Sequence, residues 1–320
     1  MSLSGLVVVI TGAARGIGQA AAGQFLARDA RVVALDRSWD GAEATAKAME
    51  STGRVLVTTA DITDPDSVAA SRQQALDRFG RVDALINNAA CRQRYLFPPH
   101  GLASVLETTD QDWNAMLGVN VLGTLTVTRS FVAPMLEQGR GSVIVVGTGG
   151  SVLQPVAPGV WRGRNTGSRN EPYDASKAAL CNMSLYLAEE LRDRGVAVNV
   201  VFPGATHTTG SGEIAAARRR LGLNEAPYLR PEHLAPVLLH LAGQTSAGET
   251  GLVIDAVQWN RDHGLGDADE WRYRPLGDSR GQADAGQDEH DRGRDAGDPG
   301  QGDDLQQAAS AGDGQGGDRP

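Results

Sequence analysis

A tyrosine and a lysine four positions apart form the pattern in this 320-residue sequence that most directly indicates chemistry. In Tyr173-Asp-Ala-Ser-Lys177, a helix would place the phenol and the ammonium on one face, one turn apart. An ordinary phenol has a pKa near ~10 and is a weak base at neutral pH. A neighbouring cation favours the ionised phenol, which can then exchange a proton with an alcohol or a carbonyl. The alternative is a core tyrosine beside a solvated lysine, but Lys177 is one of only two lysines in the chain.

A glycine-rich segment near the N-terminus predicts a phosphate site. It reads Thr11-Gly-Ala-Ala-Arg-Gly-Ile-Gly18, and it lies between an apolar run and an alanine-rich amphipathic segment. In the dinucleotide-binding pattern the first glycine allows a sharp turn, the second lets the backbone approach a pyrophosphate, and the third permits close helix packing. The N-terminus of the following helix offers free N–H groups to the phosphates. A glycine triplet alone is a weak signal, but a strand before it and a helix after it are the required context.

Asp36 ends the next predicted strand, 18 residues after Gly18. A carboxylate at this place can accept a hydrogen bond from the 2′-hydroxyl of an adenosine ribose, and it repels a 2′-phosphate. The sequence therefore favours NAD over NADP. Arg15 and Arg37 argue the other way, because either guanidinium can meet a 2′-phosphate. An ordinary acid at a strand end is the alternative reading of Asp36.

The elements that must position these residues alternate between strands and helices. Continuous apolar runs such as 6–10 are typical of parallel strands that are buried on both faces. The alternation predicts a doubly wound α/β fold, a seven-stranded parallel Rossmann sheet with helices on both faces. Strands are expected at 6–10, 31–36, 55–60, 82–86, 142–146, 196–202 and 251–256, and helices at 17–28, 41–51, 65–79, 110–137, 173–194 and 231–242.

The charge of the chain is concentrated at its C-terminal end. Residues 277–320 contain 11 Gly, 10 Asp and one large apolar residue, and they carry −7 of the formal net charge of −9. A segment of this composition cannot bury enough apolar surface to form a core, so we expect it to be disordered. We predict a catalytic domain over 1–262, a C-terminal extension over 263–276 and an acidic tail over 277–320. The net charge of residues 1–276 is close to zero, which argues against a protein that binds nucleic acids.

Cysteine usage and hydropathy exclude several other classes of protein. Cys91 and Cys181 cannot form a disulfide framework, and no cluster of His, Cys and acidic residues has metal-ligand spacing, so no metal is predicted. The N-terminus lacks a signal-type segment, and no run approaches the ~20 apolar residues of a membrane span. We therefore expect a soluble, cytoplasmic protein without a membrane or nucleic-acid partner.

From about Gly5 to Ile254 the sequence resembles the short-chain dehydrogenase/reductase family. The resemblance rests on six motifs that occur in the order of the family. They are Thr11–Gly18, Asp61-Ile62, Asn87-Asn-Ala-Ala90, Asn120 in Asn120-Val-Leu-Gly123, the pair Tyr173 and Lys177, and Pro203–Thr208.

The resemblance implies a role for each motif. Tyr173 would be the general acid/base, Lys177 would favour its ionised form and bind the nicotinamide ribose, and Asn120 would hold a water that relays protons. Asp61 and Ile62 would contact adenine. The residues expected to bind the cofactor are Thr11, Gly12, Arg15, Gly16, Ile17, Gly18, Asp36, Arg37, Asp61, Ile62, Asn88, Tyr173, Lys177, Pro203, Gly204, Thr206 and Thr208.

The sequence departs from the family at the catalytic serine that usually follows the fifth strand. Thr148 aligns with that position, and Ser151 is the competing candidate. A threonine hydroxyl has the same capacity to donate and accept hydrogen bonds as a serine hydroxyl, so the function is compatible with either residue. The family's usual glycine in the Asn-Asn-Ala-Gly motif is replaced by Ala90, and the usual terminal glycine pair of the last strand is missing.

Two segments that are longer than in the family, around 91–100 and 161–170, follow strand ends where open α/β sheets bind ligands. The arginines in them predict an anionic substrate, such as a carboxylate or the phosphate of an acyl carrier. Solvated arginines in an arginine-rich protein are the alternative. The arginines are Arg92, Arg94, Arg162, Arg164 and Arg169, and the expected substrate-binding residues are Thr148, Ser151, Trp161, Arg162 and Arg164.

Together, motifs and resemblance predict an NAD-dependent oxidoreductase that transfers a hydride between nicotinamide and a secondary alcohol or ketone. The alternatives are an NADP-dependent 3-oxoacyl-type ketoreductase, a reductase of another bond such as C=C, and a non-catalytic dinucleotide sensor. A sensor would be favoured had Tyr173, Lys177 or Asn120 been lost, and none is. The resemblance also implies a homodimer or homotetramer built through the helices at 110–137 and 173–194.

Overall fold

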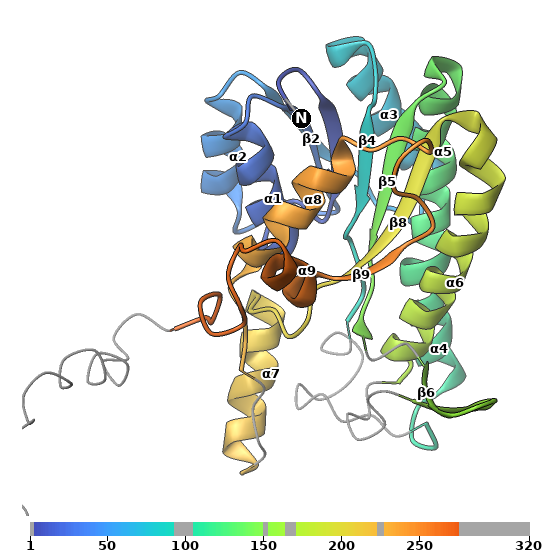
Figure 1. Ribbon diagram of the computed structural model, residues 1–320. Coiled ribbons are helices and arrows are strands. Elements are labelled where there is room, and N and C mark those ends of the chain that lie inside the picture. The colour runs from blue at the N-terminus through green and yellow to red at the C-terminus, as the bar shows by residue number, and fades with distance from the viewer. Residues whose placement is uncertain (1–2, 93–104, 150–152, 164–170, 223–226, 275–320) are drawn as a thin grey trace, which may run out of the picture. The chain divides into compact units, whose positions relative to one another are not determined.

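A seven-stranded, fully parallel sheet with strand order β3-β2-β1-β4-β5-β8-β9 organises the computed structural model (Figure 1). The structure describes residues 3–92, 105–149, 153–163, 171–222 and 227–274, and within 153–155 and 161–163 it describes only the backbone. The strands are β1 (Val7–Thr11), β2 (Arg31–Asp36), β3 (Val55–Thr59), β4 (Ala84–Asn87), β5 (Gly141–Val146), β8 (Val196–Phe202) and β9 (Val253–Asp255). The predicted doubly wound fold is confirmed.

Helices cover both faces of the sheet (Figure 1). On one face lie α1 (Gly16–Leu26), α2 (Glu43–Glu50) and α8 (Ala235–Ala242), and on the other lie α3 (Pro65–Phe79), α5 (Thr124–Gln138) and α6 (Tyr173–Leu191). Strand β1 shows why continuous apolar runs are required. Val8 and Ile10 belong to the core on the α1 side, whereas Val7 and Val9 belong to the core on the α5 side. Both faces of the strand are thus buried.

The helix predicted at 110–137 is interrupted by a π-helical turn. It consists of α4 (Asp110–Leu117), the π turn η2 (Gly118–Gly123) and α5. This turn was not predicted because the apolar pattern continues through it. By length and composition the stretch Asp110–Gln138 resembles a membrane span, but Phe131 and Met135 are fully buried in the core of the sheet. It is therefore a core helix of this fold.

The C-terminal part of the fold differs from the sequence prediction. The expected strand 251–256 is shorter, because Asp255 accepts hydrogen bonds from the backbone N–H groups of Val257 and Gln258 and so caps a helix, α9 (Ala256–Asp262). Two further elements were not predicted. They are the antiparallel hairpin of β6 (Leu153–Ala157) and β7 (Val160–Gly163), and helix α7 (Thr209–Arg220) with its capping box of Thr208 and Ser211.

Short 3₁₀ turns adjoin two of the helices, η4 (Arg192–Arg194) after α6 and η5 (Pro231–Leu234) before α8. Met1–Tyr273 forms one compact unit, so residues 263–273 pack with the body of the fold. The predicted boundary at residue 277 lies outside the described residues.

The turn from β1 into α1 depends on its glycines. Gly12 and Gly16 have φ angles of +68° and +59°, which L side chains rarely adopt. Gly18 has an ordinary helical conformation, but a Cβ atom there would lie 2.1 Å from the carbonyl oxygen of Gly12. Since that oxygen belongs to the backbone, the turn must shift to admit any side chain.

Gly18→Ala should therefore lower the free energy of unfolding by about 1–3 kcal/mol, as overpacking does elsewhere. Gly23 offers a matched control in the same helix, because a Cβ atom at that position meets nothing within 4 Å. Gly23→Ala should raise the free energy of unfolding by up to about 1 kcal/mol through helix propensity. Urea denaturation measures both changes, and equal midpoints for the two variants would contradict the packing described for Gly18.

Candidate active site

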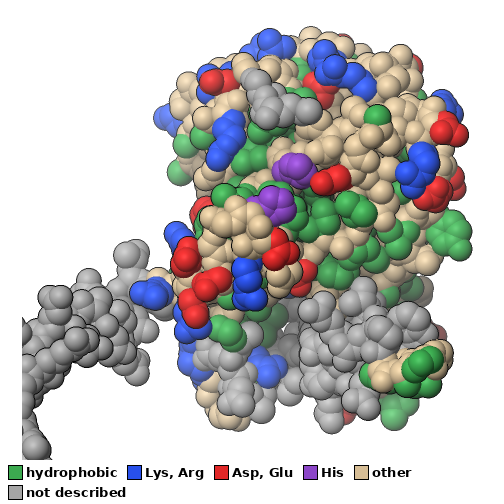
Figure 2. All heavy atoms as spheres, in the orientation of Figure 1, with side chains coloured by type: hydrophobic (Ala, Val, Ile, Leu, Met, Phe, Trp, Pro, Cys, Tyr) green, Lys and Arg blue, Asp and Glu red, His purple; other side chains and the backbone are tan. Residues whose placement is uncertain are grey.

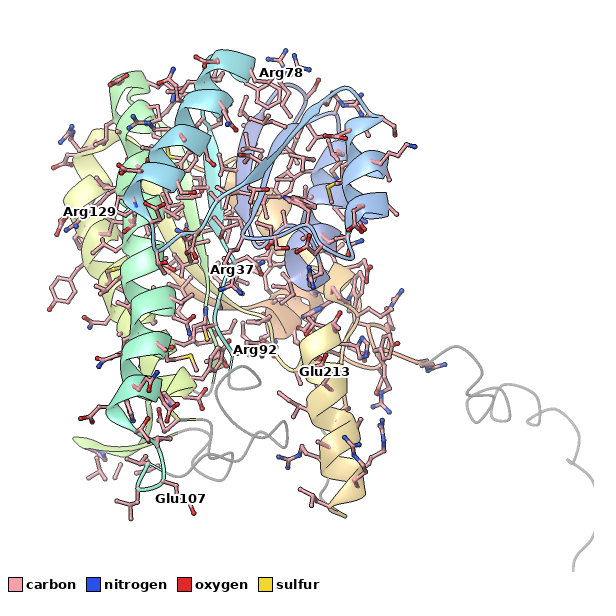
Figure 3. All side chains as sticks on the ribbon, turned by 180° about the vertical axis from the view of Figure 1, so that it is seen from behind. Arg37, Arg78, Arg92, Glu107, Arg129 and Glu213 are labelled. Atoms are coloured by element: carbon pink, nitrogen blue, oxygen red, sulfur yellow. The ribbon has the colours of Figure 1, made fainter. Side chains whose placement is uncertain are left out.

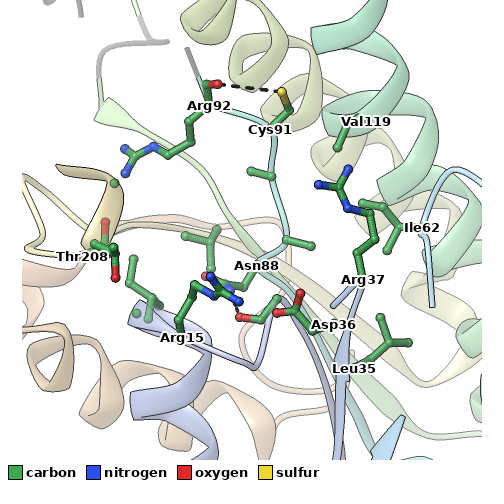
Figure 4. A pocket seen from close by; sticks show the side chains of 18 of the residues that line it. Arg15, Leu35, Asp36, Arg37, Ile62, Asn88, Cys91, Arg92, Val119 and Thr208 are labelled. Atoms are coloured by element: carbon green, nitrogen blue, oxygen red, sulfur yellow. Dashed lines mark hydrogen bonds between the residues drawn. The ribbon is translucent and has the colours of Figure 1, made fainter. Parts of the chain in front are cut away.

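A cavity of about 750 Å³ lies at the carboxyl ends of the strands (Figure 4). Every residue predicted to bind the cofactor lines it, apart from Thr11 and Gly18. Figure 3 shows the molecule from behind. Arg37 and Arg92 lie toward the cavity end of the sheet, and Arg78 lies at the opposite end. Parallel strands gather distant parts of the sequence here because all their carboxyl ends meet at one edge.

The N-terminus of α1 opens onto this cavity. Its N-cap residue, Arg15, provides no side-chain cap and instead donates a hydrogen bond to the backbone oxygen of Asp40, 3.1 Å away. The first N–H groups of a helix have no partner within the helix, so such an end suits an anion. Gly12, Gly16 and Ile17 line the cavity at this point.

Thr11 and Asn88 join the glycine-rich turn to the loop after β4. The Thr11 hydroxyl accepts hydrogen bonds from the backbone N–H groups of Asn88 and Ala89, both at 3.0 Å. The Asn88 side-chain amide donates to the carbonyl oxygens of Thr11, at 2.9 Å, and Gly12, at 3.2 Å. These contacts fix the separation of the two loops, so Thr11 acts on the cavity through its neighbours.

Carboxylates and arginines alternate at the β2 and β3 side of the cavity. Figure 4 shows Asp36 between Arg15 and Arg37. The Asp36 carboxylate accepts a hydrogen bond from the backbone N–H of Ala14 at 2.9 Å. Burial alone would raise the pKa of Asp61. Hydrogen bonds from Thr63 and the positive charge of Arg37 together have the larger effect, so the pKa of Asp61 lies below its ordinary value. Asp61 is therefore negatively charged on this side of the cavity at neutral pH.

Tyr173 and Lys177 lie on the first turn and a half of α6 and both line the cavity. The Lys177 Nζ is 5.8 Å from the centroid of the Tyr173 ring and donates a hydrogen bond to the carbonyl oxygen of Val146, at the end of β5, at 2.8 Å. Lys177 is only 2% exposed. Burial lowers the pKa of this ammonium, Tyr173 opposes that effect, and Arg92 adds to it.

Asn120 lies in the π turn η2 and links three parts of the site. Its side-chain oxygen accepts from the backbone N–H of Cys91 at 2.7 Å, and its side-chain nitrogen donates to the carbonyl oxygen of Cys91 at 3.1 Å. The same nitrogen lies 2.8 Å from the hydroxyl of Ser176 on α6. Asn120 is buried and does not line the cavity. It therefore fixes the chain between β4 and Arg92 relative to α6.

Arg92 is a site residue that the sequence analysis grouped only with the arginines of the first long segment. Its guanidinium carbon lies 5.4 Å from the centroid of the Tyr173 ring, and its side chain extends into the cavity (Figure 4). Tyr173 thus has cations within 6 Å of its ring from two directions. No local sequence signal predicts this contact, because Arg92 and Tyr173 are brought together only by the sheet.

The remaining predicted residues are not assembled in this cavity. Thr148 lies two residues after the end of β5 but is not among the lining residues. Ser151 and Arg164 lie outside the described residues, and for Trp161 and Arg162 the structure describes only the backbone, in β7. Within the described part of the chain, no group of three or more His, Cys, Asp or Glu side chains is placed to hold a metal ion.

Comparisons with known proteins agree with this geometry. The chain is 44% identical over 277 residues to fluoren-9-ol dehydrogenase of Terrabacter sp. (strain DBF63), covering 86% of this chain and 77% of that protein. It is 33% identical to 3-oxoacyl-(acyl-carrier-protein) reductase of Thermotoga maritima over 79% of this chain and 97% of that protein.

Solved structures and a family model point the same way. A 3-ketoacyl-(acyl-carrier-protein) reductase from Brucella melitensis, complexed with NADH, matches with a TM-score of 0.66 at 27% identity, covering 79% of this chain and 97% of that one. Levodione reductase matches with a TM-score of 0.66 at 25% identity, covering 79% and 96%. The family model for short chain dehydrogenase matches residues 6–219. This chain therefore belongs to the short-chain dehydrogenase/reductase family, oxidoreductases that act on alcohol and ketone groups with a nicotinamide dinucleotide.

Proposed function

We propose that this protein is an NAD-dependent dehydrogenase or ketoreductase that interconverts a secondary alcohol and a ketone. The observation that carries the proposal is the buried ammonium of Lys177 beside Tyr173, at one end of a cavity whose other end holds a glycine-rich helix N-terminus and Asp36. A proton-transfer group and a dinucleotide cradle in one cavity are what a hydride-transfer enzyme needs.

The residues of the cavity fit a nicotinamide dinucleotide. Gly12, Gly16 and the uncapped N-terminus of α1 would hold the pyrophosphate, and Asp36 would accept a hydrogen bond from the adenosine ribose. Asp61 and Ile62 would contact adenine, and the loop Pro203–Thr208 would bracket the nicotinamide. The bound cofactor supplies the atom that accepts or donates the hydride.

In this proposal Tyr173 is the general acid/base that exchanges a proton with the substrate oxygen. In the direction of oxidation its phenolate oxygen takes the hydroxyl proton of the alcohol while the C–H electron pair leaves as hydride, and in the direction of reduction the phenol returns that proton to the carbonyl oxygen. The positive charge of Lys177 would stabilise negative charge that develops on the phenol oxygen during this transfer. The Asn120 side-chain oxygen accepts a hydrogen bond from the backbone N–H of Cys91 and has a second lone pair for a relay water. The hydroxyl of Thr148, or that of Ser151, would orient the reacting oxygen.

Two observations support different substrates. Arg92, the cavity arginine beside Tyr173, has no carboxylate within ion-pair distance among the described residues and favours a substrate with an anionic group. The similarity to fluoren-9-ol dehydrogenase favours a neutral polycyclic alcohol. We take the anionic substrate as the first candidate and the polycyclic alcohol as the second. The similarity to 3-oxoacyl-(acyl-carrier-protein) reductase is compatible with the first.

We also propose a homodimer or homotetramer, as the resemblance implies. Leu122, in the π turn η2 of the long helix, is 61% exposed. The edge strand β9 exposes Val253, and Leu252 precedes it on the surface. Figure 2 shows hydrophobic side chains gathered over this edge, a surface that a second copy would cover.

Tyr173→Phe should lower kcat for oxidation of secondary alcohols by about 10²–10⁴-fold, because it removes the proton acceptor but keeps the ring. The rate is followed by the absorbance of the reduced cofactor. Tyr186→Phe is the matched control, since Tyr186 is exposed on the same helix. Activity of Tyr173→Phe equal to that of Tyr186→Phe would refute the proposed mechanism.

Asp36→Ser should lower the ratio of kcat/KM for NAD to kcat/KM for NADP by about tenfold or more, a change of about 1.4 kcal/mol. The physical reason is that the substitution removes the carboxylate that repels a 2′-phosphate. Asp40→Asn is a control at the same cavity, because Asp40 contacts Arg15 through its backbone oxygen. An unchanged ratio in Asp36→Ser would show that Asp36 does not select the cofactor.

Arg92→Met tests the substrate class with a matched pair of ketones, fluorenone and a fluorenone carboxylate. Loss of a charge-assisted hydrogen bond should raise KM for the carboxylate by about 10–100-fold. KM for neutral fluorenone should stay within about twofold. Equal KM changes for both ketones would favour the neutral polycyclic substrate, and Arg37→Met controls for a general loss of cavity charge.

A further inference from the structure

The loop Pro203–Thr208 is the first of three backbone segments that lie side by side. The loop pairs with residue 229 through hydrogen bonds from His207 N to Leu229 O and from Leu229 N to Ala205 O, both 2.8 Å long. Residues 228–230 pair in turn with the C-terminal segment, through bonds from Arg230 N to Trp271 O and from Tyr273 N to Tyr228 O, also 2.8 Å long. The C-terminal segment is thereby connected to the loop that lines the cavity.

An aromatic stack reinforces this backbone connection. The imidazole of His207 lies on the ring of Tyr273, with centroids 3.5 Å apart and planes 5° apart. The Tyr228 ring meets the same imidazole edge-on at 6.2 Å. Beside them, the Arg230 guanidinium lies 5.2 Å from the centroid of the Trp271 ring. Ring stacking and cation–π contacts add to the stabilisation that comes from the area they bury, so these side chains reinforce the backbone pairing of the loop.

The start of the loop is held from a second side. The buried imidazole of His233 has Nε2 2.6 Å from the carbonyl oxygen of Pro203 and Nδ1 2.6 Å from that of Arg230. Burial lowers the pKa of His233, although both carbonyls oppose the effect. Asn260, on α9, donates to the backbone oxygen of His233 at 2.8 Å. The chain after residue 202 is therefore anchored to two C-terminal elements.

The loop Pro203–Thr208 faces the cavity on one side and the ring of Tyr273 on the other. Pro203, Gly204, Thr206 and Thr208 line the cavity, whereas His207, between the two threonines, contacts Tyr273. In an extended segment successive side chains point to opposite sides, so a residue that holds the anchor can set the position of its neighbours without touching the ligand.

We infer that residues 263–273 are a positioning element for the cofactor side of the site, with Tyr273 as the positioning residue. This inference rests on the proposed function in one respect, namely that the loop Pro203–Thr208 contacts the dinucleotide. It extends the functional part of the chain to Tyr273, beyond the boundary at residue 262 that the sequence analysis predicted.

Hydrogen exchange of the full-length protein without ligand tests the anchor itself. Tyr273→Ala should speed amide exchange in peptides that cover 203–212 by about tenfold, while exchange in β1 stays at the parent rate. Tyr273→Phe keeps the stacking ring and should behave like the parent. Tyr186→Ala removes an exposed tyrosine elsewhere and should leave this loop unchanged. Parent-like exchange in Tyr273→Ala, or an equal rise in β1, would overturn the inference.

Titration of the same variants with NADH tests the consequence for the site. The Kd for NADH should rise by about fivefold or more in Tyr273→Ala and stay within about twofold in Tyr273→Phe and Tyr186→Ala. A loop that exchanges faster while NADH binds as in the parent would refute the positioning role. If the parent protein bound neither NADH nor NADPH, the proposed function would be wrong, and the exchange measurement would still decide whether Tyr273 holds the loop.

Discussion

The site depends on one buried charge, the ammonium of Lys177. Taking such a charge out of water is unfavourable, and burial lowers its pKa. The fold compensates with the carbonyl oxygen of Val146, 2.8 Å away, and with the ring of Tyr173. This arrangement exists only if the end of β5 and the start of α6 meet. The sheet order that places β5 between β4 and β8 is therefore a condition of the proposed chemistry as well as of the core.

The loop after β4 is positioned by the same constraint. Asn120 holds both backbone groups of Cys91 and lies 2.8 Å from Ser176, which is next to Lys177 on α6. The π turn around Asn120 thus connects the long helix, the β4 loop and α6 at the level of Tyr173. On the opposite side the C-terminal segment holds the loop after β8. The walls of the cavity come from segments that are distant in sequence and are fixed by a few polar contacts.

Much of the fold and of the cavity was predictable from the sequence because the signals are local. Continuous apolar runs marked the buried strands, and short spacings such as Tyr173 to Lys177 placed side chains on one face. Contacts between distant segments left no such signal, and the stack of His207 on Tyr273 and the approach of Arg92 to Tyr173 belong to this class. Helix α7 was not predicted because it begins with Thr-Gly-Ser-Gly, which lacks apolar periodicity. The last strand was predicted too long because Asp255, near its expected end, caps helix α9 instead. The choice between Thr148 and Ser151 stays a prediction.

The central claim, that the Lys177 ammonium gives Tyr173 its proton chemistry, is tested most directly by kcat of Lys177→Met at saturating dinucleotide. Methionine fills a similar volume without the charge, so the cavity keeps its walls while the phenol loses its cationic neighbour. The account predicts that kcat for a secondary alcohol falls by about 100-fold or more, within the range attributed to general acid–base catalysis. A Lys177→Met variant that turned over the alcohol at the parent rate would contradict it.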